Sequence, residues 1–233
     1  MKIIKNPSPN FENRPPSVSV NLLLFHYTGM KSASEAMARL CSPESKVSAH
    51  YLIDEVGNIF SLVEENKRAW HAGVASWNDD VDINNISVGV EISNPGHEFG
   101  YSRYSERQMI AVEALSIDII KRHSIRAARV LGHSDVSPSR KYDPGELFDW
   151  ERLAAAGIGI WPKISPVSVN FEIGSIRQCQ KQLKMIGYGL KITGVLDELT
   201  RDTILAFQRH WLPDQLTGKF DVETVWRLSL IHI

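Results

Sequence analysis

The sequence has few cysteines, almost no net charge and no long apolar run. Its 233 residues include two cysteines, 26 lysines and arginines, and 27 aspartates and glutamates. Cys41 and Cys179 lie far apart in the chain, which argues against a disulfide framework and against a zinc ribbon. A net charge of −1 argues against the basic surface that nucleic acid binding needs. We therefore expect reduced thiols and no nucleic acid partner.

No segment approaches the roughly 20 consecutive apolar residues that a membrane-spanning helix requires. The N-terminus has only a short apolar segment before its prolines begin, and it shows no recognisable export signal. The sequence therefore predicts a soluble chain without a membrane span, which we expect to be monomeric. A length of 233 residues with 43% hydrophobic content suits one medium domain and a second, small one.

The first domain is predicted to be α/β, with a mixed central sheet flanked by helices. Val18–Tyr27 and Ile86–Ser93 have the composition of buried central strands, and His50–Val63 alternates like a β-hairpin. Tyr104–His123 carries apolar residues at helical spacing after a Ser-x-x-Gln capping box. Residues 5–16 hold four prolines and are expected to form an extended arm.

The C-terminal part repeats a turn followed by a helix. Thr193-Gly194 and Asp197 recur as Thr217-Gly218 and Asp221. The glycine permits a turn conformation that other residues disfavour, and the aspartate caps the next helix. With a first helix over Ile173–Ile186, the repeats predict a small all-α three-helix domain. The predicted division is a first domain over residues 1–155, a linker over 156–171 and a helical domain over 172–233.

The stretch Val130–Gly145 has the composition of a site rather than of a core. A short apolar run ends at His133, and a polar loop containing two prolines leads to Asp143. Histidine and aspartate are suitable zinc ligands, and the prolines hold their backbone. A third candidate is His26 at the C-terminal tip of its strand, where ligands collect in open sheets.

Glu91 and Lys141 complete a hydrolytic scheme. Glu91 points away from the apolar face of its strand and is flanked by Gly89 and Ser93, which suggests room for a substrate. Three protein ligands with an open fourth position are typical of zinc sites that lower the pKa of water from about 15.7 to about 7. Glu91 would take the proton of that water, and Lys141 would face the developing oxyanion. Serine and cysteine nucleophiles have no supporting motif.

Five segments resemble the zinc-dependent N-acetylmuramoyl-L-alanine amidases of the amidase-2 type, which share a fold with peptidoglycan recognition proteins. The segments are FHYT (25–28), SAHY (48–51), AWHAG (69–73), VGVEISN (88–94), and GH (132–133) through RKYDPG (140–145). The resemblance covers about residues 15–155, in the order of the family. Residues 172–230 resemble the helical peptidoglycan-binding domain that is often appended to wall hydrolases.

The resemblance implies one Zn²⁺ per chain and hydrolysis of the amide bond between N-acetylmuramic acid and L-alanine, in peptidoglycan or muropeptides. The implied metal ligands are His26, His133 and Asp143. The implied catalytic residues are Glu91 as acid-base and Lys141 as oxyanion stabiliser. The residues expected to bind substrate are His50, His71 and Asn94. For the two histidines, hydrogen bonding within the fold is the alternative.

Two other functions remain open at this point: a non-catalytic peptidoglycan recognition protein on the same fold, and an unrelated metal-dependent hydrolase such as a nuclease. The complete ligand set with Glu91 and Lys141 favours the amidase, and the near-neutral charge argues against the nuclease. A helical domain that tethers the enzyme to an insoluble polymer favours a wall-facing location, periplasmic or secreted. The missing export signal makes the cytoplasm the alternative.

Overall fold

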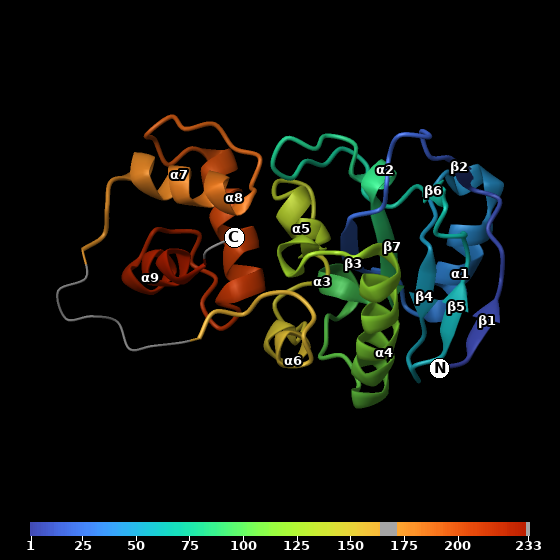
Figure 1. Cartoon of the computed structure of the whole chain (residues 1–233). Coiled ribbons are helices and arrows are strands. Elements are labelled where there is room, and N and C mark those ends of the chain that lie inside the picture. Colours follow the sequence, from blue (N-terminus) through green and yellow to red (C-terminus); the bar gives the residue numbers. More distant parts are fainter. Residues whose placement is uncertain (164–171, 232–233) are drawn as a thin grey trace.

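The computed structural model describes residues 1–163 and 172–231 (Figure 1). A six-stranded mixed sheet has the order β1-β5-β4-β7-β3-β8, and a separate two-stranded ribbon pairs β2 with β6. The strands are β1 (Ile3–Lys5), β2 (Phe11–Asn13), β3 (Leu22–Tyr27), β4 (Tyr51–Ile53), β5 (Ile59–Ser61), β6 (Lys67–Ala69), β7 (Ser87–Ile92) and β8 (Val130–Gly132). The α-helices are α1 (Ala33–Cys41), α2 (Ile83–Ile86), α3 (Gly96–Phe99), α4 (Glu106–His123), α5 (His133–Val136), α6 (Trp150–Ala155), α7 (Ile176–Ile186), α8 (Glu198–Trp211) and α9 (Val222–Leu230). The predicted α/β class is confirmed.

The central strand β3 is buried on both faces. Its neighbours β7 and β8 run parallel to it, an arrangement that needs cover on both sides of the sheet. Leu23 and Phe25 pack into the apolar cluster that contains the inner face of α4, whereas Leu22 and Leu24 belong to the cluster on the opposite face. Because side chains alternate along a strand, His26 lies on the same face as Leu22 and Leu24.

The predicted hairpin and long helix are present. β4 and β5 pair in antiparallel fashion around the turn that contains Gly57, and α4 begins with the capping box of Ser105 and Gln108. The N-terminal arm is extended, as predicted, and it also pairs with other strands: β1 lies at the edge of the main sheet and β2 belongs to the small ribbon. Half of the predicted linker, residues 164–171, lies outside the described residues. None of the described helices has the length and apolar character to cross a membrane.

The two C-terminal repeats have the same internal hydrogen bonding. Asp197 caps α8 and Asp221 caps α9, as predicted. A glutamine from the preceding helix supports each turn, a contact that no local pattern in the sequence indicates. Gln180 donates to two threonine hydroxyls and accepts from the Gly194 amide, and Gln208 does the same in the second repeat.

The helices α7–α9 share a core with the sheet. Leu183, Ile204 and Phe207 belong to the same apolar cluster as Leu22 and Leu24 of β3. The three helices lie together beside α5, at one end of the molecule (Figure 1). The division into two domains stays a prediction, but in the described part of the chain the helical segment shares an apolar cluster with β3 and packs against α5.

One loop makes part of this contact. The Asn78 amide donates to the Gly187 carbonyl at 2.7 Å, and the rings of Trp77 and Tyr188 meet edge to face with their centroids 5.0 Å apart. Trp77 and Tyr188 are each almost fully buried. The loop before α2 and the segment after α7 therefore bury large aromatic rings against each other.

Candidate metal centre and active site

The three parallel central strands bring the predicted functional residues to one edge of the sheet. His26 of β3 lies directly opposite Glu91 of β7. On the other side of β3, Phe25 pairs with Gly132, so that His133 begins α5 next to His26. Carboxyl ends of parallel strands meet at the same edge of a sheet, which is where open α/β folds place their sites.

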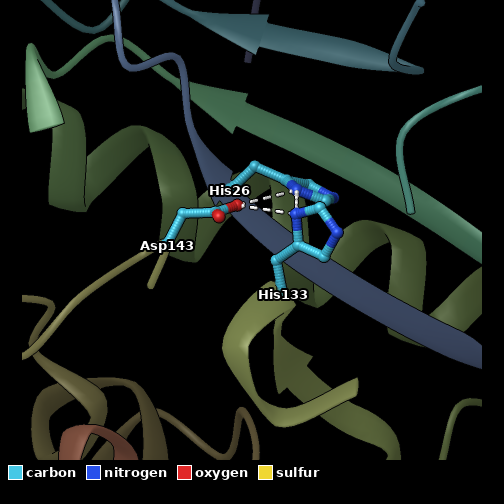
Figure 2. A group of neighbouring side chains, drawn as sticks. All are labelled: His26, His133 and Asp143. Carbon is cyan, nitrogen blue, oxygen red and sulfur yellow. Dashed lines mark hydrogen bonds and ion pairs between the residues drawn. The ribbon is translucent and has the colours of Figure 1, made fainter. Parts of the chain in front are cut away.

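Asp143 reaches this edge from the loop after α5. The amide of Ser134 donates to the Asp143 carbonyl at 2.9 Å, which ties the loop to the turn that carries His133. The hydroxyls of Tyr101 and Tyr104 both donate to the Pro144 carbonyl. Figure 2 shows the Asp143 carboxylate and the two imidazoles of His26 and His133 converging on one point.

A backbone carbonyl fixes the tautomer of His133. Its Nε2 lies 2.9 Å from the carbonyl oxygen of Ala72. A carbonyl oxygen only accepts hydrogen bonds, so Nε2 must carry the ring proton. A neutral His133 therefore presents a bare Nδ1 lone pair to Asp143 and His26.

A longer chain of hydrogen bonds fixes the tautomer of His26. The Ser87 hydroxyl donates to the Ile83 carbonyl at 2.6 Å, so its oxygen accepts from His71 Nε2 at 3.3 Å. Burial lowers the pKa of His71 well below its ordinary value, and burial together with His133 lowers the pKa of His26 to about 4. A neutral His71 accepts at Nδ1, 3.0 Å from His26 Nε2. His26 therefore also presents a bare Nδ1.

Gly89 makes room for this chain. A Cβ atom on Gly89 would lie 2.5 Å from the imidazole of His71. The sequence suggested that the small residues beside Glu91 leave space for substrate. Beside Gly89 the ring of His71 fills the space, while Glu91 itself lines the cavity.

Three buried acceptors thus face one point. His26 Nδ1, His133 Nδ1 and Asp143 Oδ2 lie 3.0 Å from one another. Burial alone would raise the pKa of Asp143, but His133 and His26 hold it well below its usual value, so the carboxylate is ionised. In the tautomers that place the ring protons on the Nε2 atoms, no proton lies between these three acceptors, and a cation removes their repulsion. Two imidazole nitrogens and one carboxylate oxygen are donors that zinc accepts. Within residues 1–163 and 172–231, this is the one such cluster of potential metal ligands.

Glu91 lines the cavity beside these three residues. Its Oε2 atom is buried and has no hydrogen-bond partner in the described part of the chain. Burial and the neighbouring Asp143 raise the pKa of Glu91 well above its usual value, while Lys141 lowers it. A carboxyl group with a raised pKa and an unpaired oxygen suits the transfer of a proton from water to a leaving group.

The cavity has a volume of about 260 Å³ and is open to solvent. Glu91, Lys141 and His71 all line it, together with the three candidate ligands. Side chains from α1 and from three loops complete its walls, among them Met30, Arg39, Leu40, Val47 and Trp70. A substrate carbonyl placed here lies beside both the Glu91 carboxyl group and the Lys141 ammonium.

Two of the residues predicted to bind substrate form hydrogen bonds within the fold and do not line the cavity. His50 is fully buried behind the cavity, where its Nδ1 accepts from the Gly89 amide and its Nε2 lies 3.1 Å from the Lys67 carbonyl. Asn94 is also buried, and its side chain bonds the Ser102 carbonyl and the Gly96 amide. Both residues are outside the cavity lining. Periodicity identifies the strands next to which they lie, but it does not show which side chains form hydrogen bonds with the backbone.

Comparison with known proteins identifies the family. A family model described as N-acetylmuramoyl-L-alanine amidase (Amidase_2) matches residues 15–146. The N-acetylmuramoyl-L-alanine amidase AmiD of Escherichia coli (strain K12) is 32% identical over 225 residues, which span 88% of this chain and 79% of AmiD. The 1,6-anhydro-N-acetylmuramyl-L-alanine amidase AmpD of Haemophilus influenzae is 31% identical, over 64% of this chain and 89% of its own.

A solved structure of Escherichia coli AmiD resembles this one over most of both chains. It contains the substrate anhydro-N-acetylmuramic acid-L-Ala-D-gamma-Glu-L-Lys, and it matches with a TM-score of 0.82 at 30% identity, covering 94% of this chain and 91% of AmiD. These relatives are enzymes, so the alternative of a non-catalytic recognition protein is not favoured. The chain belongs to the Amidase_2 family of N-acetylmuramoyl-L-alanine amidases, enzymes that hydrolyse the amide bond between N-acetylmuramic acid and L-alanine.

Proposed function

We propose that this amidase is zinc-dependent and that His26, His133 and Asp143 hold one Zn²⁺ per chain. One observation carries the proposal: three buried acceptor atoms lie 3.0 Å from one another. Hydrogen bonds behind both histidines leave their Nδ1 atoms without protons. The aspartate supplies a negative charge, and two neutral imidazoles complete a donor set of the kind that catalytic zinc uses.

A zinc ion bound there supplies a Lewis acid that polarises the substrate carbonyl and makes a nearby water more acidic. Glu91 takes one proton from the attacking water as the new C–O bond forms. The Lys141 ammonium faces the oxyanion that develops on the carbonyl oxygen. Glu91 then returns the proton to the amide nitrogen, the C–N bond breaks, and the products are the lactyl carboxylate and the free amine of L-alanine.

The proposed substrates are muropeptides and peptidoglycan. Support comes from the AmiD complex, whose bound substrate is an anhydro-muramyl peptide. His71 lines the cavity, but the nearest partner of its Nδ1 is His26. We therefore assign His71 to the positioning of His26 rather than to substrate binding.

Replacement of a proposed ligand tests the zinc site. The wild-type protein is expected to hold one zinc per chain, and His133→Ala is expected to hold almost none, because two donors rarely suffice for a stable site. The measurement is zinc content by atomic emission after gel filtration. Treatment of the wild type with a chelator is expected to stop the release of peptide from purified muropeptides, followed by mass spectrometry.

The control is His97→Ala, which removes a histidine outside the ligand set and is expected to keep full occupancy. Equal zinc content in His133→Ala and wild type would exclude the proposed ligands.

We propose further that residues 172–233 bind peptidoglycan, joined by residues 156–171 to a catalytic part over 1–155. A match to AmiD that spans 88% of the chain has to include part of this helical segment. The proposed location is therefore wall-facing, periplasmic or secreted, with the cytoplasm as the alternative.

A competition experiment tests the second binding site. Full-length Glu91→Gln is expected to sediment with purified sacculi, and saturating soluble muropeptides are expected to leave much of it bound, because they occupy only the cavity. Bovine serum albumin serves as the control for trapping in the pellet. Complete release by soluble muropeptides would show that the cavity alone binds the wall.

A further inference from the structure

Asp135 is a buried carboxylate that the proposed mechanism does not use. It is completely inaccessible to solvent and lies in α5, two residues after His133. An ionised side chain in such a place is costly unless several donors pair with it. The structure shows which groups these are.

Two of its three donors come from the C-terminal helical segment. Asp135 Oδ1 accepts from the Tyr188 hydroxyl at 2.7 Å. Its Oδ2 lies 2.7 Å from His210 Nδ1 and accepts from the Gly132 amide at 2.8 Å. Burial and the neighbouring Asp135 raise the pKa of Tyr188 well above its ordinary value, so the phenol keeps its proton and donates.

The His210 ring is itself held by aromatic stacking. Its centroid lies 3.7 Å from that of Trp150 in α6 and 3.7 Å from that of Trp211, with nearly parallel planes. Tyr188 is wedged against Trp77 in the same buried seam. Tyr188 and His210 therefore cannot move away from the Asp135 carboxylate unless the packed rings of Trp77, Trp150 and Trp211 move as well.

Three consecutive residues of α5 therefore have three different attachments. His133 is a proposed zinc ligand, the Ser134 amide holds the carbonyl of the ligand Asp143, and Asp135 is held by Tyr188 and His210. The turn is only four residues long and is closed by the bond from the Ser137 amide to the His133 carbonyl, so its orientation depends mainly on these attachments.

We propose that the C-terminal helical segment is a structural component of the metal centre, in addition to any role in wall binding. Tyr188 and His210 act through Asp135 as positioning residues: they fix the turn that presents His133 and aligns Asp143. The inference rests on the proposed zinc site. It predicts that a change in the helical segment alters zinc affinity at a site that the segment does not touch.

The test is the zinc dissociation constant of full-length variants, measured by competition with a chromophoric chelator. Tyr188→Phe removes one hydroxyl and keeps the ring, so the fold is retained. We expect its dissociation constant to rise by about tenfold, at the lower end of what supporting residues around metal ligands contribute. The visible absorption spectrum of the Co²⁺ form is expected to shift as well, because it reports ligand geometry.

The matched control is Val225→Ala, which weakens the packing of α9, a helix that does not contact Asp135. It is expected to lower the melting temperature while the zinc affinity and the Co²⁺ spectrum stay those of the wild type. If Tyr188→Phe lowers only the melting temperature, the contacts to Asp135 only hold the helical segment against α5. That result would overturn the inference. If the wild-type protein holds no zinc, both the zinc proposal and this inference are overturned.

Discussion

Replacing Glu91 by glutamine is expected to lower kcat by about 10²–10⁴-fold while zinc and the fold are retained. The amide has nearly the shape of the carboxyl group, but it neither takes a proton from water nor returns one to the leaving nitrogen. Oε2 of Glu91 has no hydrogen-bond partner among the described residues, so no structural bond is lost with the substitution. Product formation from purified muropeptides, followed by mass spectrometry, measures the effect.

Glu98→Gln provides the matched control for this experiment. Glu98 is an exposed residue of α3, and the same change of charge there is expected to leave kcat unchanged. Zinc content and melting temperature are measured for both variants. Turnover by Glu91→Gln at the wild-type rate would refute the proton transfer assigned to this residue.

The orientation of the Glu91 side chain could be predicted from the sequence because strand periodicity is simple. Val88, Val90 and Ile92 alternate with it, so a single strand assignment placed its side chain on the opposite face. The candidate ligand His26 was equally accessible, since it ends a buried apolar run. What brings the two residues together is the parallel pairing of β3 with β7, which places them directly opposite each other.

The roles of the supporting residues around the site could not be predicted in this way. His50 and His71 look alike in the sequence, yet one lies behind the cavity and the other lies on its wall. The difference depends on which backbone groups are left unpaired in the folded sheet. Hydrogen bonds of that kind join residues far apart in the chain, and no local pattern records them.

The relation between the two parts of the chain shows the same limit. The repeat and its capping aspartates predicted the helices α8 and α9, because these are local features. The amphipathic pattern also predicted an apolar interior for the helical segment. That pattern does not show whether the apolar face is closed within three helices or continues onto another surface. In the structure the helices pack on one another and share their apolar cluster with β3.

Ending the chain at Lys163 is expected to prevent stable folding. Removal of the helical segment takes away part of the apolar cluster that contains Leu22 and Leu24, and it takes from Asp135 two of its three donors. Each large apolar side chain contributes roughly 1.5–3 kcal/mol when buried, and unpairing a buried charge costs about 3–5 kcal/mol. A domain has only about 5–15 kcal/mol in total. Aggregation or a strongly lowered melting temperature is therefore the expected result, measured by gel filtration and calorimetry.

A full-length chain with a protease site introduced between residues 164 and 171 supplies the control. After cleavage its two pieces are expected to elute together and to keep their activity on soluble muropeptides, because the shared core, not the covalent link, holds them. A helical segment that only tethers the enzyme to the wall predicts the reverse in both experiments. The truncated chain would then be folded and fully active on soluble muropeptides, and cleavage of the full chain would release the helical piece. Either result would contradict the role assigned to the shared core.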